Sequence, residues 1–207
     1  MQFGITFRKD YLTSSQARAI LDGIERDSID GLRDYAIFAL MVTCGLRTVE
    51  IIRANIEDLR TLGDCRVLYV QGKGHAAKDD LVKVPAHVEA AIMAYLKEAG
   101  TPETGEPLFR SNANRNKRGR LTTRSVSRIV KERMKNAGYN NDRLTAHSLR
   151  HTAATLMLLN GKSPQEVQQV LRHKAITTTM IYSHNLDRTN NDGESRVAAA
   201  IFGNEAI

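Results

Sequence analysis

Residues 145–161, TAHSLRHTAATLMLLNG, form the stretch on which the prediction of the fold depends. Thr145 is a candidate N-cap and Gly161 a candidate C-terminal stop, so the stretch predicts one helix. At 100° per residue, His147 and Arg150 lie on one side of that helix, and most of its apolar residues lie on the other. We therefore expect the apolar side to pack on the core while His147 and Arg150 face outward together.

The polar side of this helix suits phosphate chemistry. An arginine binds phosphate through two parallel hydrogen bonds and stays charged, and a histidine can move a proton near neutral pH. His147 and His151 also have the spacing of two zinc ligands on a helix, but Ser148 stands where a metalloprotease has glutamate. Arg150 would place a positive charge beside such a metal. Taken alone, these residues are equally typical of a polar helix face with ordinary surface histidines.

The sequence on either side of this stretch predicts a mostly helical fold. Residues 32–45, LRDYAIFALMVTCG, are apolar on nearly every side and predict a central buried helix that ends at Gly45. Caps and apolar residues at helical spacing predict further helices over residues 12–24, 48–54, 87–100, 125–138, 163–173 and from 177 onward.

Two short runs rich in β-branched residues predict strands. They are RVLYV at 66–70 and LVKVP at 81–85, and the loop QGKGHAAKDD joins them. The expected fold class is therefore α+β and mostly helical, with a small antiparallel sheet or hairpin.

Composition points to a polyanionic partner. The chain has 207 residues, with 30 Lys and Arg against 23 Asp and Glu, a net charge of +7 and an isoelectric point of about 9.6. Nucleic acid is the first candidate partner, and a basic enzyme without such a partner is the alternative. The sequence shows no signal peptide and no apolar run of membrane-spanning length, and we expect Cys44 and Cys65 to stay reduced in a cytosolic compartment.

A basic stretch at residues 110–131 predicts a segment that binds DNA. It contains eight basic residues and no acid. Such a segment suits salt-sensitive contacts to a DNA backbone, and a surface loop that touches no DNA is the alternative. The expected contacts are Lys78, Arg115, Lys117, Arg118, Arg120, Arg124 and Arg128.

Four stretches together resemble the tyrosine recombinases, the phage-integrase family. TCGLRTVEI is similar to the first arginine box of that family, and QGKG is similar to its β-hairpin lysine. HSLRHT resembles the H-x-x-R box, and LRHKAITTTMIYSH resembles the C-terminal box with its tyrosine. The boxes occur in the family's order over about residues 11–186. The positions that match the family's functional residues are Arg47, Glu50, Lys73, His147, Arg150, His173 and Tyr182.

The resemblance implies that Tyr182 is the nucleophile of a DNA strand transferase. A free phenol has a pKa near 10 and is a poor nucleophile at neutral pH, so it needs cations and a base nearby. Arg47 and Arg150 would hold the scissile phosphate and stabilise the transition state. The product would be a 3′-phosphotyrosine, which a second 5′ hydroxyl attacks to reseal the strand. No metal, ATP or other cofactor is therefore expected.

The remaining matched residues have supporting roles by the same resemblance. His147 would assist proton removal from Tyr182, and Lys73 would protonate the departing 5′ oxygen. His173 would hydrogen-bond a phosphate oxygen, and Glu50 would orient an arginine or histidine. Taken alone, Arg47, Glu50, Lys73 and Tyr182 could instead be a capping cation, a surface ion pair, a loop lysine and a core tyrosine. His151 is interpreted as packing behind His147.

One residue departs from the family pattern. The family commonly has glycine before the histidine of its C-terminal box, and this chain has Arg172. We expect Arg172 either to contact a DNA phosphate or to shift the end of the helix before it.

By the same resemblance, the expected biology is integration of a phage or another mobile element in a bacterial cytoplasm, near the nucleoid. Resolution of chromosome dimers and DNA inversion are alternatives with the same chemistry. Two hypotheses from other classes are an idle DNA-binding module and a zinc hydrolase.

The expected architecture is a single catalytic domain over residues 1–207 without the family's N-terminal core-binding domain. Residues 187–207 would form a tail that protomers can exchange. The expected partners are double-stranded DNA, further copies of the chain in a tetramer on synapsed DNA, and DNA-bending accessory proteins, with a monomer when DNA is absent and no membrane contact.

Overall fold

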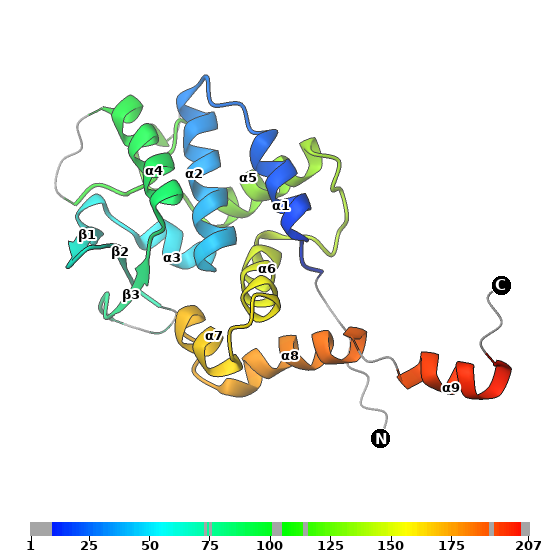
Figure 1. Ribbon diagram of the computed structural model, residues 1–207. Helices are drawn as coiled ribbons and strands as arrows, with labels where there is room; N and C mark the ends of the chain where they lie inside the picture. The colour runs from blue at the N-terminus through cyan, green and yellow to red at the C-terminus, as the bar shows by residue number, and fades with distance from the viewer. Residues whose placement is uncertain are drawn as a thin grey trace.

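The computed structural model describes residues 10–72, 74, 76–100, 105–113, 116–190 and 193–203, with only the backbone described over 184–190. The fold is α+β and mostly helical, with a small antiparallel sheet, which confirms the predicted class (Figure 1). In chain order the elements are α1 Ser14–Asp22, α2 Ile29–Cys44, α3 Thr48–Arg53, the 3₁₀ turn η1 Ile56–Asp58, β1 Leu59–Leu62, β2 Cys65–Val70, β3 Asp80–Lys83, α4 Ala86–Ala99, α5 Thr123–Asn136, α6 Ala146–Leu159, α7 Pro164–Leu171, α8 Ile176–Asn190 and α9 Gly193–Phe202.

Helix α2 is the centre of the core, as predicted. It runs between α4 and α1 and also packs against α5 and α6 (Figure 1). Its residues are buried on nearly every side. Gly45 ends it with a left-handed φ of 64°. A Cβ on this glycine would lie 2.3 Å from Cδ2 of Leu171, so the close approach of α7 also requires glycine here.

Caps set the starts of the helices where the sequence places them. Thr13 forms a capping box with Gln16, and Ser163 forms one with Glu166 ahead of Pro164. Thr145 caps α6. The last predicted helix was expected to be short, but α8 is 15 residues long, and the tail forms α9, which no motif predicted.

The sheet has three antiparallel strands in the order β1-β2-β3, where the sequence predicted two. The missed strand β1 has one buried residue, Leu59, and three exposed ones, so it lacks the apolar alternation of a strand. Leu59 pairs with Leu68, which pairs in turn with Val82. These three side chains are buried on the core side of the sheet.

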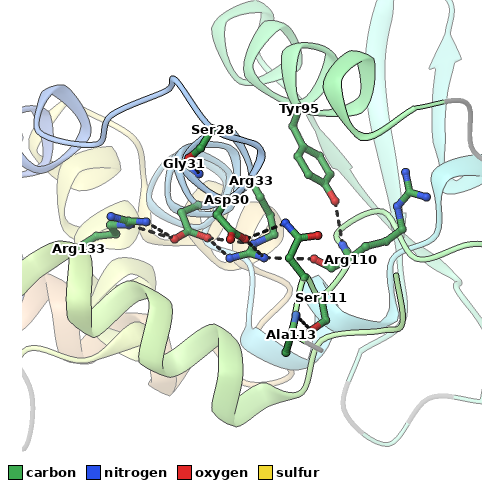
Figure 2. Close-up of polar contacts among 11 residues, drawn as sticks. Ser28, Asp30, Gly31, Arg33, Tyr95, Arg110, Ser111, Ala113 and Arg133 are labelled. Atoms are coloured by element: carbon green, nitrogen blue, oxygen red, sulfur yellow. Dashed lines mark hydrogen bonds and ion pairs between the residues drawn. The ribbon is translucent and has the colours of Figure 1, made fainter. Parts of the chain in front are cut away.

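A buried polar network holds segment 105–113 against the N-terminal half of α2. Asp34 accepts hydrogen bonds from Arg33 and, at 2.6 Å, from Arg133 of α5. Arg33 also donates to the carbonyl of Arg110, whose own N–H donates to the hydroxyl of Tyr95 (Figure 2). Because its guanidinium binds the carbonyls at the end of α4, Arg110 belongs to the scaffold and is not a free cation.

None of the helices within the described ranges is long and apolar enough to cross a bilayer.

Candidate active site

Arg47 and Glu50 form a fixed pair at the start of α3. Arg47 is the N-cap of that helix and lies directly after the left-handed turn at Gly45. Both its backbone N–H and its Nη1 donate to Glu50, each at 2.8 Å. Glu50 is 0% exposed, so the surface ion pair considered from sequence is wrong. A buried carboxylate with two contacts to one arginine orients that arginine.

Arg150 is buried, so the prediction that it faces outward with His147 is wrong. Its side chain is 1% exposed, whereas His147 is exposed as expected. Arg150 donates from Nη1 to the carbonyl of Gly45 at 2.6 Å and from Nη2 to the carbonyl of Leu171. These carbonyls lie at the C-terminal ends of α2 and α7, which lack intrahelical partners and attract cations. The two helix ends therefore cover a side of α6 that its sequence suggested was open.

Burial also shifts the pKa of Arg150. Burial, followed by the positive charge of Arg47, lowers its pKa to about 9, while the negative charge of Glu50 acts in the opposite direction. The guanidinium stays protonated at neutral pH. Arg47, Glu50 and Arg150 therefore belong to one electrostatic cluster, although Arg150 is far from the other two in sequence.

His173 and Tyr182 lie next to this cluster. The ring of His173 stacks on Tyr182 with 6.3 Å between centroids, and its Nδ1 is 2.8 Å from Oγ1 of Thr179. Burial, followed by the charge of Arg150, lowers the pKa of His173 to about 4, so its ring is neutral at pH 7. Tyr182 is 7% exposed. Burial raises the pKa of its phenol, and the charges of Arg150 and Arg47 oppose that rise.

A row of rings joins the exposed histidine to the buried tyrosine. His151 is 4.8 Å from His147 and 5.0 Å from Tyr182 between ring centroids, edge-to-face with both. Sequence reasoning placed His151 behind His147, whereas the structure places it between His147 and Tyr182. The contact with Tyr182 spans two helices, so no local pattern could have shown it. In the described part of the chain, no group of three or more His, Cys, Asp or Glu residues has the arrangement of a metal site.

Arg172 points inward instead of toward a DNA backbone. Its side chain is 7% exposed, and its Nη2 donates to Glu50 at 2.8 Å. At the end of α7, Arg172 itself adopts the left-handed conformation with φ 56° and ψ 47°. The expectation of a phosphate contact is therefore not supported by this geometry.

A cationic groove opens beside the cluster. Its volume is about 770 Å³, and residues of α3, α5 and α6 line it. Its basic and titratable lining consists of Arg47, Arg124, Arg128, Lys131, His147 and Arg150. The two arginines predicted on α5 are exposed and thus share one groove with His147 and the buried guanidinium of Arg150.

Comparison with known proteins identifies the family. A profile described as the phage integrase family matches residues 10–189. The chain belongs to the phage integrase family. It is 34% identical over 179 residues to tyrosine recombinase XerC of Caldanaerobacter subterraneus subsp. tengcongensis. The aligned region covers 84% of this chain and 47% of that protein. It is 35% identical over 181 residues to tyrosine recombinase XerC of Pelobacter propionicus, over 86% of this chain and 56% of that protein.

Solved structures of phage integrase family members share the fold. The XerA recombinase superposes with a TM-score of 0.71 at 28% identity, over 95% of this chain and 66% of that one. The XerH recombinase in a post-cleavage complex with difH superposes with a TM-score of 0.73 at 25% identity, over 87% of this chain and 52% of that one. The chain spans about half the length of the curated relatives that it matches.

Arg47, Arg150, His173 and Tyr182 from three of the matched boxes lie near one another in the described structure, whereas the predicted DNA contacts divide into two groups. Arg124, Arg128 and Lys117 are exposed. Arg120 instead donates to the carbonyl of Ile52 and, at 2.6 Å, to Asn55, and Lys78 pairs with Asp58. Arg118 is exposed and forms a loose ion pair with Glu106 at 3.8 Å. Lys73 and Arg115 lie outside the described residues.

Proposed function

We propose that this chain is the catalytic domain of a site-specific tyrosine recombinase, which cuts and rejoins DNA through Tyr182. One observation carries the proposal: Arg47, Arg150, His173 and Tyr182, drawn from separate parts of the chain, lie within electrostatic or ring contact of one another. Two guanidinium groups beside a phenol provide what transfer of a phosphoryl group to tyrosine requires.

The cleavage step begins with attack of the Tyr182 oxygen on the scissile phosphorus. The bond from phosphorus to the 5′ oxygen breaks, and a 3′-phosphotyrosine forms. The Tyr182 phenol, whose pKa burial raises above its ordinary value, is protonated at rest and gains its reactivity when DNA is bound. Arg47 and Arg150 neutralise the charge that grows on the non-bridging oxygens.

Protons move through the histidines and the hairpin lysine. His147 is the acceptor that the family pattern proposes for the phenol proton, with His151 lying between the two rings. The neutral His173 donates a hydrogen bond to a phosphate oxygen, and Thr179 fixes the other side of its ring. Lys73 would protonate the leaving 5′ oxygen. A second 5′ hydroxyl then attacks the phosphotyrosine and reverses the sequence.

Double-stranded DNA is the proposed substrate. The basic lining of the groove supports this proposal, and the XerH structures in the comparison are described as bound to difH substrate. Arg124, Arg128 and Lys117 would contact phosphates or base edges on either side of the cleaved position.

A further copy of the chain is the proposed protein partner. Helix α9 lies apart from the other helices, and its Val197, Ile201 and Phe202 are exposed (Figure 1). An exposed apolar face of this kind commonly marks a site where another protein surface binds. We propose that α9 packs on a neighbouring protomer in a tetramer assembled on DNA. Deleting residues 193–207 should weaken assembly on DNA, as sedimentation would show, without unfolding the remainder.

The relatives favour one biological role over another. The expected role was integration of a mobile element, whereas the curated relatives reported above carry the name XerC, and XerD proteins match as well. These names support the alternative, resolution of chromosome dimers, over integration. The chemistry at Tyr182 is the same in both cases.

Relaxation of supercoiled plasmid tests the proposed chemistry without knowledge of the target site. The protein is incubated with plasmid in EDTA beside a Tyr182→Phe variant. Relaxation and an SDS-stable protein–DNA adduct are expected from the parent and not from the variant. Equal activity of parent and variant would favour an idle DNA-binding module or a contaminating nuclease. Activity that is seen in a parallel reaction without EDTA and is absent with it would instead point to a metal-dependent hydrolase.

A further inference from the structure

Arg172 has a backbone conformation that glycine normally adopts. Among the described residues other than glycine, only Arg118 shares a positive φ. The left-handed region brings Cβ close to backbone atoms, so arginine is less stable there than glycine. Some contact of the Arg172 side chain must offset this strain.

Burial of the Arg172 side chain adds a second cost. The side chain is 7% exposed, and within the described structure its Nε–H has no hydrogen-bond partner. A buried donor without an acceptor destabilises the folded state. These two costs indicate that Arg172 is not present mainly for stability.

The compensating contact of Arg172 leads directly into the active site. Its Nη2 donates to Oε2 of Glu50 at 2.8 Å, and its Nη1 donates to the carbonyl of Val170 at 2.8 Å. Glu50 also receives two hydrogen bonds from Arg47, from the backbone N–H to Oε2 and from Nη1 to Oε1. The buried carboxylate therefore lies between Arg172 and Arg47.

We propose that Arg172 is a positioning residue: it fixes the carboxylate of Glu50, and Glu50 in turn fixes the guanidinium of Arg47 against the scissile phosphate. This inference rests on the proposed function. Without Arg172, Oε2 of Glu50 loses its charged donor, so the carboxylate can rotate and Arg47 can leave its orientation. The positive charge of Arg172 also acts on Arg150 and His173, which places it inside the same electrostatic cluster.

An Arg172→Gly variant separates positioning from stability. Glycine relieves the backbone strain and removes the unpaired Nε–H, so the thermal midpoint should stay level or rise. Arg118→Gly is the matched control for the backbone effect, because Arg118 has the same left-handed backbone at an exposed site. Adduct formation on supercoiled plasmid at saturating protein should slow about 100-fold in Arg172→Gly, because misplacement by about 1 Å has this effect. Plasmid affinity should change little.

Two further variants test the route through Glu50. Arg172→Lys keeps a charge near Oε2 of Glu50 but loses the hydrogen bond to the carbonyl of Val170. It should therefore form the adduct faster than Arg172→Gly and more slowly than the parent. Glu50→Gln should slow adduct formation on its own, and adding Arg172→Gly to it should slow the reaction no further. Such non-additivity is expected of residues that act through one another. Additive losses would contradict the route through Glu50.

Nitrogen-15 NMR of the Arg47 side chain gives a readout that does not depend on cleavage. In the parent, Glu50 should hold the Arg47 guanidinium, so its Nη signals should show slow rotation. Arg172→Gly should speed this rotation, and the Arg47→Lys spectrum assigns the signals. If the parent forms no adduct, the proposed function fails and the NMR result still decides the role of Arg172.

Three results would overturn the inference. The first is a folded Arg172→Gly protein with unchanged Arg47 signals. The second is an Arg172→Gly protein with the adduct rate of the parent. The third is a loss of rate that follows a loss of thermal stability; if Arg172→Gly does not fold, the Arg172→Lys spectra and rates decide in its place.

Discussion

Burial shifts the pKa values of three side chains of the proposed active site. Burial raises the pKa of Tyr182, lowers that of His173 to about 4 and lowers that of Arg150 to about 9. At pH 7 the site therefore presents a neutral phenol, a neutral imidazole and a guanidinium cation. The motifs give the order of these residues along the chain. The burial that shifts their pKa values comes from tertiary contacts that no motif contains.

The depressed pKa of His173 predicts how stability depends on pH. The folded state disfavours the protonated ring, so between pH 6.5 and about 4 the unfolded state binds more protons. The contribution of His173 to stability is therefore fully present above pH 6.5 and is lost as pH falls toward 4. Urea midpoints measured from pH 7 to pH 4 should fall less steeply in His173→Gln than in the parent. His87→Gln, a change at an exposed position of α4, should keep the slope of the parent.

Arg150 stabilises the fold as well as the proposed transition state. Arg150→Lys leaves at least one of the carbonyls of Gly45 and Leu171 without its donor. A buried acceptor without a partner costs about 1–3 kcal/mol, and we expect a loss of that size in chemical denaturation. Arg128→Lys, a change on the exposed face of α5, should stay within about 0.5 kcal/mol of the parent. Equal stability of the two variants would show that Arg150 does not join the helix ends.

At the scale of elements, local chemistry predicts most helix boundaries. Thr13, Ser163 with Pro164, and Gly45 mark helix ends by their own side chains or backbone. Strand β1 could not be predicted in this way, because its pairing with β2 decides its structure and its apolar content does not. The direction of Arg150 was mispredicted for a related reason: helical periodicity gives the faces of α6, but the ends of α2 and α7 decide which face is covered.

A substitution at Gly45 tests whether the end of α2 lies in close contact with Leu171 of α7. In Gly45→Ala, both the left-handed φ and the 2.3 Å approach of Cβ to Cδ2 of Leu171 should lower the stability of the folded state. The expected loss is about 2–5 kcal/mol, the sum of the left-handed backbone cost and overpacking. Gly63→Ala has a similar φ of 56° with nothing within 4 Å, so only the backbone cost of about 1–2 kcal/mol should appear. Equal losses in the two variants would contradict the contact with α7.

At the scale of the whole molecule, some basic side chains hold the fold together through internal hydrogen bonds, and others are exposed on the surface. The sequence predicts a basic stretch that binds DNA, and its charge supports that prediction. It could not show that Arg110 and Arg120 are used inside the protein, because their acceptors lie on distant segments. Only the exposed cations remain to release counterions from DNA.

Salt dependence of binding should separate these two groups of arginines. Arg124→Gln and Arg128→Gln should each reduce the slope of log K against log salt by about 0.9, because each removes one phosphate contact. Arg120→Gln should leave the slope unchanged and lower the thermal stability, since its guanidinium binds Ile52 and Asn55. Fluorescence anisotropy with duplex DNA at several salt concentrations measures the slope. A reduced slope in Arg120→Gln would mean that this side chain turns outward on DNA.

The central claim is that Tyr182 forms the covalent bond to DNA, and mapping the linked residue tests it most directly. The adduct trapped on supercoiled plasmid is digested with nuclease and protease, and mass spectrometry locates the residue that carries the nucleotide 3′-phosphate. We predict that the modified peptide contains Tyr182 and that the linkage persists in EDTA. A nucleotide attached to any other tyrosine, or to a serine or histidine, would contradict the assignment of the nucleophile.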